Sequence, residues 1–214
     1  MKTGAEAYSR RVLSVYDVWV LTISTRWIWR CPAGKLISFY NRHISGNHLD
    51  VGVGTGYFLD KCRFPVLSPR VALLDLNPNS LSYTAGRIRR YQPATVAANV
   101  LAPLNWKTEP FDSIGLNFLL HCLPGNLASK AAVFEHLMPY LKPGGVIFGS
   151  TILGKGVARN PAAVALMKQY NATGIFSNQE DDREGLEAAL ATLFHRYEIE
   201  VKGCVALFSG HSKD

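Results

Sequence analysis

The residues in this 214-residue chain that most clearly could do chemistry lie in a glycine turn after an apolar run. Glycines stand at positions 52, 54 and 56, and Asp50 precedes them. Glycine has no Cβ and reaches positive φ, so backbone N–H groups in such a turn can approach a ligand closely. The residues that follow have apolar side chains at helical spacing, which would direct a helix N-terminus into the same crevice. This order of strand, turn and helix predicts a cofactor site.

The spacing of the glycines departs from that of a dinucleotide-binding turn. Such turns follow the pattern G-x-G-x-x-G, whereas this sequence is D-x-G-x-G-x-G and has Tyr57 where a later glycine would stand. The carboxylate of Asp50 would repel a pyrophosphate and would attract a cationic or amine-bearing ligand. A nicotinamide cofactor is therefore the weaker alternative.

A second acidic residue, Asp75, ends the next apolar run, RVALLD at 70–75. It follows the glycine turn at a distance of about 20 residues, where a carboxylate can accept both hydroxyls of a ribose. Asn77 and Pro78 then begin a helix, because Asn is a favoured cap and Pro a favoured early helical residue. The alternative function for Asp75 is to cap that helix.

The elements that must position these residues are short apolar strands that alternate with helices. This alternation indicates an α/β fold with a mainly parallel, doubly wound sheet. A chain with 48% apolar residues can bury one core, so we expect a single domain. The expected strands are 49–53, 70–75, 94–101 (ending near Asn99) and 111–120, and residues 140–153 would contain a helix end, a Pro-Gly-Gly turn and the fifth strand. A helix at 182–194 and an antiparallel hairpin of strands 197–202 and 204–210 would follow.

Taken together over residues 47–153, these motifs resemble the class I S-adenosylmethionine-dependent methyltransferases, of the small-molecule type. The turn with Asp50 is similar to the family's first motif, which holds the methionine part of the cofactor, and Asp75 to the second, which holds the ribose. The Pro-Gly-Gly at 143–145 is similar to a turn that precedes the family's fifth strand. The resemblance implies a Rossmann-like sheet of seven strands, S-adenosylmethionine as cofactor and S-adenosylhomocysteine as its product.

The resemblance also implies the remaining contacts to the cofactor. Asn99 and Val100 would hold the adenine edge; many members have Asp where this chain has Asn99, and an amide oxygen can accept the same bond without charge assistance. Asn117 and Phe118 would pass beneath the sulfur. The expected cofactor-binding residues are Asp50, Gly52, Gly54, Thr55, Gly56, Tyr57, Asp75, Leu76, Asn77, Asn99, Val100, Asn117 and Phe118.

His121 is the imidazole expected closest to the transferred methyl group, in the loop after the fourth strand. Methyl transfer is an in-line displacement, which mainly needs alignment and desolvation. A base matters only where the acceptor is a hydroxyl or a protonated amine, and a histidine can serve as that base. His121 is therefore the candidate catalytic residue. Its alternative function is to pack against the cofactor or to bind backbone without moving a proton.

Two segments rich in aromatic residues are expected to enclose the acceptor. Residues 1–45 would form a helical lid and residues 154–180 a cap inserted after the fifth strand, around a cofactor-binding core at 46–153; residues 181–214 would close the fold. For each aromatic side chain alone, core packing is the alternative. The candidate substrate-binding residues are Tyr16, Trp29, His121, Tyr170 and Phe176. Such walls favour a planar or apolar acceptor from secondary metabolism.

Composition narrows the remaining function classes. The net charge of +7 could indicate an anionic partner, but the densest basic cluster, at 87–90, fits a solvated helix end. RNA binding usually needs a longer basic stripe or an added domain, so we expect a small-molecule substrate and no nucleic acid. An RNA or protein methyltransferase and a non-catalytic cofactor-binding module stay open as alternatives.

Two further patterns concern location and metal. No apolar run of about 18 residues exists, which argues against a membrane span. The four cysteines lack C-x-x-C spacing, which disfavours zinc and indicates reduced thiols in the cytosol. The sequence also lacks an acidic ligand cluster. We therefore expect a cytoplasmic, metal-independent enzyme that is a monomer or a homodimer.

Overall fold

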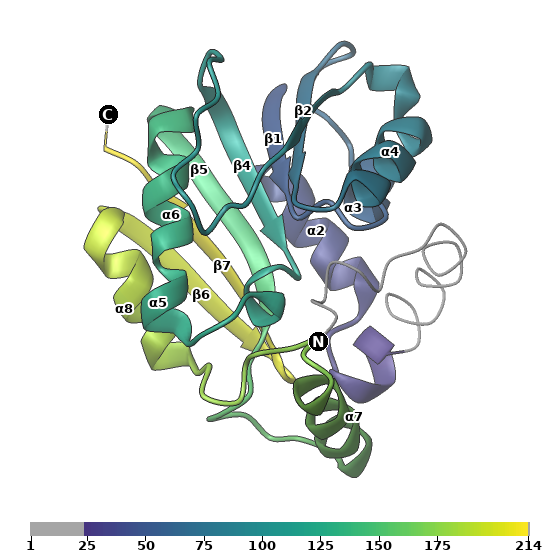
Figure 1. Cartoon of the computed structure of the whole chain (residues 1–214), viewed down its shortest axis with the longest axis vertical. Coiled ribbons are helices and arrows are strands. Elements are labelled where there is room, and N and C mark those ends of the chain that lie inside the picture. The colour runs from purple at the N-terminus through teal and green to yellow at the C-terminus, as the bar shows by residue number, and fades with distance from the viewer. Residues whose placement is uncertain (1–23, 214) are drawn as a thin grey trace.

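A seven-stranded sheet with helices on both faces makes up the protein (Figure 1). The structure is a computed structural model and describes residues 24–213. The strand order is β3-β2-β1-β4-β5-β7-β6. β7 runs antiparallel to both β5 and β6, and the other neighbours are parallel. The strands are β1 (Asn47–Val51), β2 (Arg70–Asp75), β3 (Ala94–Ala97), β4 (Phe111–Asn117), β5 (Leu141–Ile152), β6 (Arg196–Lys202) and β7 (Val205–His211).

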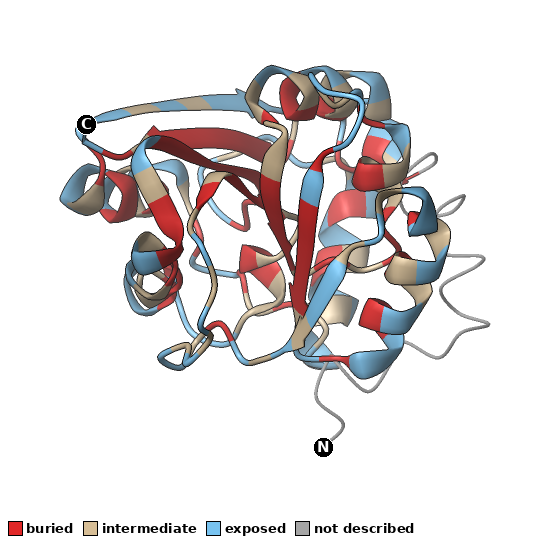
Figure 2. Cartoon of the chain, turned by 90° about the horizontal axis from the view of Figure 1, so that it is seen from above, coloured by how far each residue is buried: buried red, intermediate tan, exposed pale blue. Residues whose placement is uncertain are grey.

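Two apolar clusters fill the space between the sheet and its helices. One cluster joins the sheet to α5 (Leu127–Lys130), α6 (Ala132–Leu137) and α8 (Arg183–Leu193). The other joins the opposite face to α2 (Ala33–His43), α3 (Tyr57–Lys61), α4 (Pro78–Arg87) and α7 (Pro161–Ala172). Three short 3-10 helices complete the fold: η3 (Arg89–Tyr91), η4 (Leu120–Cys122) and η5 (Met138–Tyr140). The central strands are buried along most of their length, whereas the helices expose their outer sides (Figure 2).

The chain order reverses between β1 and β4, so these neighbours form the switch point of the sheet. β1 pairs with β2 on one side and with β4 on the other. In open α/β sheets, ligands bind outside the carboxyl ends of the strands at such a point. The glycine turn follows β1 directly, and the loop with η4 follows β4.

The predicted fold class is confirmed, and several elements match their predicted bounds closely. β2 spans 70–75 as expected, and the Asn77 side chain caps α4 by accepting the Asn79 N–H at 2.9 Å. α7 begins at Pro161, after a cap from the Asn160 side chain. α8 and the antiparallel pair β6–β7 occupy the expected C-terminal positions.

Three predicted elements are shorter than the sequence suggested. β3 ends at Ala97 and not near Asn99, because its one partner, β2, ends at Asp75, which pairs with Ala97. β4 ends at Asn117, because Phe118 leaves the extended region with φ +55°. The helix after the glycine turn begins only at Tyr57, since Gly56 has φ +70°.

The Pro-Gly-Gly segment differs in another way. It lies within the long strand β5 and not before it. Pairing moves from Phe111↔Leu141 to Ser113↔Val146, so residues 142–145 bulge out of the register. Gly144 makes the bulge possible with φ +70°.

Part of the predicted lid lies outside the described residues. This includes Tyr16, whose contacts therefore stay a prediction. Residues 24–28 form a short π-helical turn ahead of α2. Across residues 24–213, no helix has the length and apolar character needed to cross a membrane.

Candidate active site

Two glycines of the turn lie against neighbouring side chains, where a Cβ would be crowded, and the third faces open space. All three have positive φ, at +69° for Gly52, +52° for Gly54 and +70° for Gly56. A Cβ at Gly52 would lie 2.6 Å from Leu119 Cδ1, and one at Gly56 would lie 2.7 Å from Thr84 Cγ2. A Cβ at Gly54 would meet nothing within 4 Å. Gly54 is therefore the point of the turn where a ligand can lie against backbone.

Asp75 lies at the carboxyl end of β2, beside this turn. Its carboxylate accepts the Asn77 N–H at 2.8 Å, but the cap of α4 is Asn77 itself. Burial raises the pKa of Asp75, the backbone groups of Asn77, Gly54 and Val53 lower it, and the charge of Asp50 raises it. Because backbone groups of the turn and the charge of Asp50 both act on Asp75, these groups lie close together. Two carboxylates in one crevice suit a ligand that carries positive charge.

Asp50 is held from behind by buried polar side chains. Its Oδ2 accepts the Tyr40 hydroxyl at 2.7 Å and lies 3.5 Å from His48 Nε2. Only 9% of the Asp50 side chain is accessible. The place of Asp50 before the glycine turn identified it as a candidate from the sequence. Tyr40 and His48 were not predicted as its partners, because no sequence spacing links a helix tyrosine to a strand carboxylate.

The predicted adenine contacts, Asn99 and Val100, follow the end of β3, and the predicted cofactor-binding residue Leu76 follows the end of β2. Leu76 is 57% exposed, which is high for a large apolar side chain and fits a residue that a ligand ring could cover. Val100 is buried. Asn99 is exposed, and its Oδ1 accepts the Leu101 N–H at 3.0 Å. A carbonyl oxygen has two lone pairs, so one remains open for a ligand donor.

At the end of β4, the Phe118 backbone has an uncommon conformation and the Asn117 side chain has a buried donor without a protein partner. Phe118 is a non-glycine residue with φ +55°, a conformation that is uncommon and clusters at functional sites. The Asn117 Oδ1 accepts the Ser150 hydroxyl at 3.1 Å, while the Asn117 Nδ2 is buried and has no protein partner. A buried donor without a partner suits a site that a polar ligand completes.

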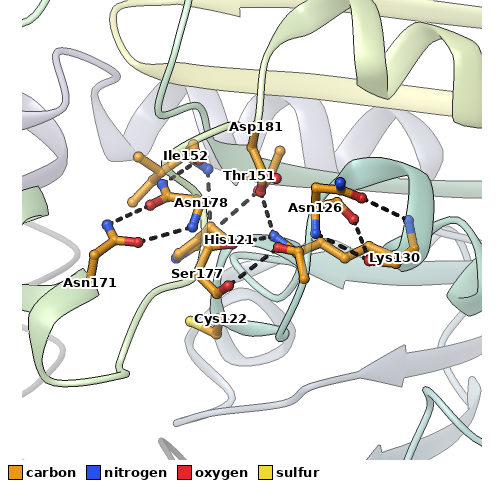
Figure 3. Close-up of polar contacts among 12 residues, drawn as sticks. His121, Cys122, Asn126, Lys130, Thr151, Ile152, Asn171, Ser177, Asn178 and Asp181 are labelled. Carbon is orange, nitrogen blue, oxygen red and sulfur yellow. Dashed lines mark hydrogen bonds and ion pairs between the residues drawn. The ribbon is translucent and has the colours of Figure 1, made fainter.

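His121 is buried in η4 and is held by the end of β5 (Figure 3). Its Nδ1 lies 3.3 Å from the Ile152 N–H, which donates to it, and 3.4 Å from Thr151 Oγ1. Burial and, to a smaller extent, the charge of Lys130 together lower the pKa of His121 to about 3. The imidazole is therefore neutral at physiological pH. Because Nδ1 accepts, the proton of the neutral ring lies on Nε2.

Four of the five predicted substrate residues lie in one aromatic cluster. Phe176 lies at its centre, with ring centroids 4.5 Å from His121, 4.9 Å from Tyr170 and 6.1 Å from Trp29. Trp29 and Phe176 are buried, so the rings pack on one another and form a wall. This brings together the N-terminal segment, η4 and the predicted cap. Core packing accounts for these contacts, and a role in binding stays a prediction.

No pattern in the sequence predicted the contacts that hold the predicted cap, residues 154–180, in place. Lys130 of α5 is fully buried, and its Nζ donates to Asp181 Oδ2 and to Ser177 O, each at 2.6 Å (Figure 3). Burial lowers the pKa of Lys130 and raises that of Asp181. Asn178 adds a bond from its Nδ2 to Ile152 O at 2.8 Å. A lone lysine in a helix usually indicates a solvated face, which is why this pair could not be predicted.

A hollow of about 470 Å³ lies on another side of the same segment. Residues 154–159, α7 and residues 179–180 contribute to its walls. None of the predicted site residues that lie within 24–213 lines it. Within residues 24–213, no three His, Cys, Asp or Glu side chains group as metal ligands would.

Comparison with known proteins identifies the class that this fold and crevice define. Residues 49–147 match the family model described as a methyltransferase domain. A demethylluteothin O-methyltransferase from Streptomyces thioluteus is 39% identical over 211 residues, which cover 99% of this chain and 92% of the relative. The physcion biosynthesis cluster O-methyltransferase from Aspergillus chevalieri is 41% identical over 207 residues, or 96% and 93% of the two chains.

A solved structure shows the same fold. The N-methyltransferase NodS from Bradyrhizobium japonicum WM9, in complex with S-adenosylhomocysteine, superposes with a TM-score of 0.68 at 15% identity over 100% of both chains. The chain therefore belongs to the class I S-adenosylmethionine-dependent methyltransferases. It is an enzyme, and its cofactor is S-adenosylmethionine.

Proposed function

We propose that this enzyme methylates a hydroxyl oxygen of a small, planar or apolar metabolite of secondary metabolism. The observation that carries the proposal is the similarity, over almost the whole chain, to two relatives named O-methyltransferases, at 39% and 41% identity. The aromatic cluster around Phe176 supports a planar or apolar acceptor, because aromatic faces stack on flat apolar groups.

In this proposal, the cofactor-binding residues predicted from the sequence hold the cofactor. S-adenosylmethionine supplies a methyl group on a sulfonium, which makes it reactive toward a nucleophilic oxygen. The Gly54 backbone and Asp50 would bind the methionine part, Asp75 the ribose hydroxyls, and Leu76, Asn99 and Val100 the adenine. The open space at Gly54, the pair of carboxylates and the unpartnered Asn117 Nδ2 support this fit.

His121 orients the acceptor or the loop in this proposal and does not act as the base. A group with a pKa of about 3 takes up a proton poorly at neutral pH, and Nδ1 already accepts a backbone N–H. The reaction still releases the hydroxyl proton as the C–O bond forms and the C–S bond breaks. A phenol or an enol suits this site, because its hydroxyl ionises without a strong protein base.

A panel of acceptors tests the reaction class. The purified protein is incubated with S-adenosylmethionine and, separately, a planar phenol, a cyclic enol, an aromatic amine, a thiol, transfer RNA and a histone peptide. We expect S-adenosylhomocysteine and a product heavier by one methylene unit from the phenol or the enol. Methylation of the amine, the RNA or the peptide alone would overturn the proposed acceptor class.

The remaining parts of the proposal have separate tests. Metal independence predicts full turnover after treatment with EDTA and no gain from added Mg²⁺. The division into a lid at 1–45, a core at 46–153 and a cap at 154–180 predicts that changes in the lid and cap alter acceptor choice more than cofactor affinity. Light scattering decides between a monomer and a homodimer.

A further inference from the structure

A chain of buried polar side chains runs behind the glycine turn and ends on Asp50. Tyr40 comes from α2, His48 and Asp50 from β1, and Ser113 from β4. His48 and Tyr40 are in contact through Nε2 and the hydroxyl at 3.0 Å, and His48 Nδ1 lies 2.8 Å from the Ser113 hydroxyl. Ser45 extends the chain, because its hydroxyl lies 2.8 Å from that of Ser113.

Four of these five side chains are buried, and Ser45, at the far end of the chain, is half-buried. Tyr40, His48 and Ser113 are 0% exposed, and Asp50 is 6% exposed. The Tyr40 ring stacks on Phe58 at 5.5 Å and meets the edge of Phe148 at 5.1 Å. Buried polar groups away from water destabilise a fold unless every one of them is satisfied, so a chain of this length needs a reason.

One arrangement of the protons satisfies every link and directs the donors of Ser113, His48 and Tyr40 toward Asp50. Burial and the charge of Asp50 raise the pKa of Tyr40 well above its ordinary value, so its hydroxyl keeps the proton and donates it to Asp50 Oδ2. The Tyr40 oxygen can then accept from His48 Nε2–H. His48 Nδ1 in turn accepts from the Ser113 hydroxyl, whose oxygen accepts the Ser45 backbone N–H at 2.9 Å, while the Ser45 hydroxyl donates to Asn47 O at 2.9 Å.

The sheet leaves room for this arrangement at one glycine. A Cβ at Gly115, the residue of β4 paired with Asp50, would lie 3.1 Å from Asp50 Oδ2 and 3.2 Å from His48 Cε1. Any larger residue there would press on both groups. Gly115 therefore leaves the space that the Asp50 carboxylate and the His48 ring occupy.

We propose that Tyr40 and His48 are positioning residues that fix the Asp50 carboxylate for the ammonium group of the cofactor's methionine part. The inference rests on the proposed function of Asp50. Tyr40 holds one carboxylate oxygen, and His48 holds Tyr40. The accessible 9% of the Asp50 side chain is what remains for the ligand. The carboxylate thus does not have to reorient when the cofactor binds.

Two ligands measured by calorimetry separate this role from a general effect on the fold. S-adenosylhomocysteine carries the amino-acid part, and 5′-methylthioadenosine lacks it. Tyr40→Phe removes the hydroxyl that holds Asp50. We expect its dissociation constant for S-adenosylhomocysteine to rise about tenfold, because a carboxylate that Tyr40 no longer holds must be ordered when the ligand binds. Its dissociation constant for 5′-methylthioadenosine should stay within about twofold of that of the parent enzyme, because this ligand does not reach Asp50.

Tyr140→Phe is the matched control. Tyr140 is also buried, and its hydroxyl bonds Leu104 O at 2.9 Å and the Trp106 N–H at 3.1 Å. The Tyr140→Phe variant should bind both ligands with the affinity of the parent enzyme. A double-mutant cycle with Asp50→Asn adds a second readout: after Asp50→Asn, Tyr40→Phe should have little further effect on S-adenosylhomocysteine binding.

A pair of His48 variants keeps the test decisive if Tyr40→Phe fails to fold. His48→Gln retains an N–H that can reach the Tyr40 hydroxyl and should retain affinity for S-adenosylhomocysteine. His48→Leu removes that donor and should weaken S-adenosylhomocysteine binding selectively. Equal weakening of both ligands, or no change with either, would overturn the positioning role. If the parent enzyme bound 5′-methylthioadenosine and S-adenosylhomocysteine with the same affinity, the function proposed for Asp50 would fail instead.

Discussion

At the scale of single residues, the proposed cofactor site combines an open backbone turn with two carboxylates. The turn at 52–56 leaves Gly54 open, whereas Asp50 and Asp75 supply negative charge beside it. These residues could be found from the sequence because type and spacing carry their chemistry directly. Tyr40 and His48 could not, because their role depends on a neighbouring strand that brings Ser113 and Gly115 close.

Asp75→Ala should weaken cofactor binding strongly. The variant removes the carboxylate proposed to accept the ribose hydroxyls, and each bond to a charged group contributes about 1.5–3 kcal/mol. Calorimetry with S-adenosylhomocysteine should show an affinity loss of at least about tenfold. Asp112→Ala, at the far end of β4, is the control and should bind as the parent does. Equal affinity of the Asp75 variant and the parent would remove the ribose assignment.

Gly54→Ala should affect binding more than folding. Positive φ makes alanine unfavourable there by about 1 kcal/mol, but the new methyl meets no protein atom within 4 Å. It would occupy the space where the cofactor approaches. Gly174→Ala is a close control, since Gly174 also has positive φ, at +74°, and open space around it. We expect similar losses of thermal stability in both variants and a loss of S-adenosylhomocysteine affinity only at Gly54.

At the scale of elements, a buried ion pair helps to hold the predicted cap against α5. Lys130 on α5 and Asp181 after α7 are 51 positions apart and both fully buried. Their pairing fixes the segment that carries Phe176 and so the aromatic wall against His121. The sequence predicted α7 and its start at Pro161 from local capping, but a tertiary pair of this kind has no local signal. The same limit explains β3, whose length is decided by its partner strand.

Lys130→Met should destabilise the protein by about 3–5 kcal/mol, because it leaves the Asp181 carboxylate buried and uncompensated. The double variant Lys130→Met with Asp181→Leu should regain most of that loss. Urea unfolding measures both. Lys142→Met is the matched surface control: its pair with Asp112 is 45% and 46% exposed, so its loss should stay below about 1 kcal/mol. Equal losses in the buried and surface variants would show that the buried pair does not hold the cap.

At the scale of the whole molecule, the fold class could be expected from alternating strands and helices, and the antiparallel C-terminal hairpin from the resemblance to the family. What could not be expected is where distant segments meet. Cys204, at the turn between β6 and β7, donates its N–H to Trp29 O at 2.8 Å, which ties the N-terminal segment to the C-terminal hairpin. The bulge at 142–145 likewise follows from the register between β4 and β5, not from the Pro-Gly-Gly motif alone.

Buried histidines should make the whole fold sensitive to acid. The pKa of His121 is lowered to about 3 and that of His43 to about 4, mainly by burial. An unfolded histidine titrates near 6.5, so below that pH the unfolded chain binds protons that the folded chain refuses. Stability should therefore be complete above pH 6.5 and fall as the pH drops toward 4.

His121→Gln should reduce this slope, by up to about 1.4 kcal/mol per pH unit, in urea titrations between pH 6.5 and 4. The exposed His195 offers the control, His195→Gln, which should keep the parent slope. Identical slopes in all three proteins would contradict a buried, neutral His121.

The packing of Trp29 against Phe176 also bears on how such an enzyme can diversify. Both residues lie outside the stretch 49–147 that the methyltransferase family model covers. The donor-binding turn and the aromatic wall are thus encoded by separate parts of the gene. Exchanges in residues 24–31 and 170–178 can accumulate without touching the glycine turn or Asp75. With the roles proposed above, relatives would keep one methyl-donor site and acquire new acceptors through changes in the flanking segments.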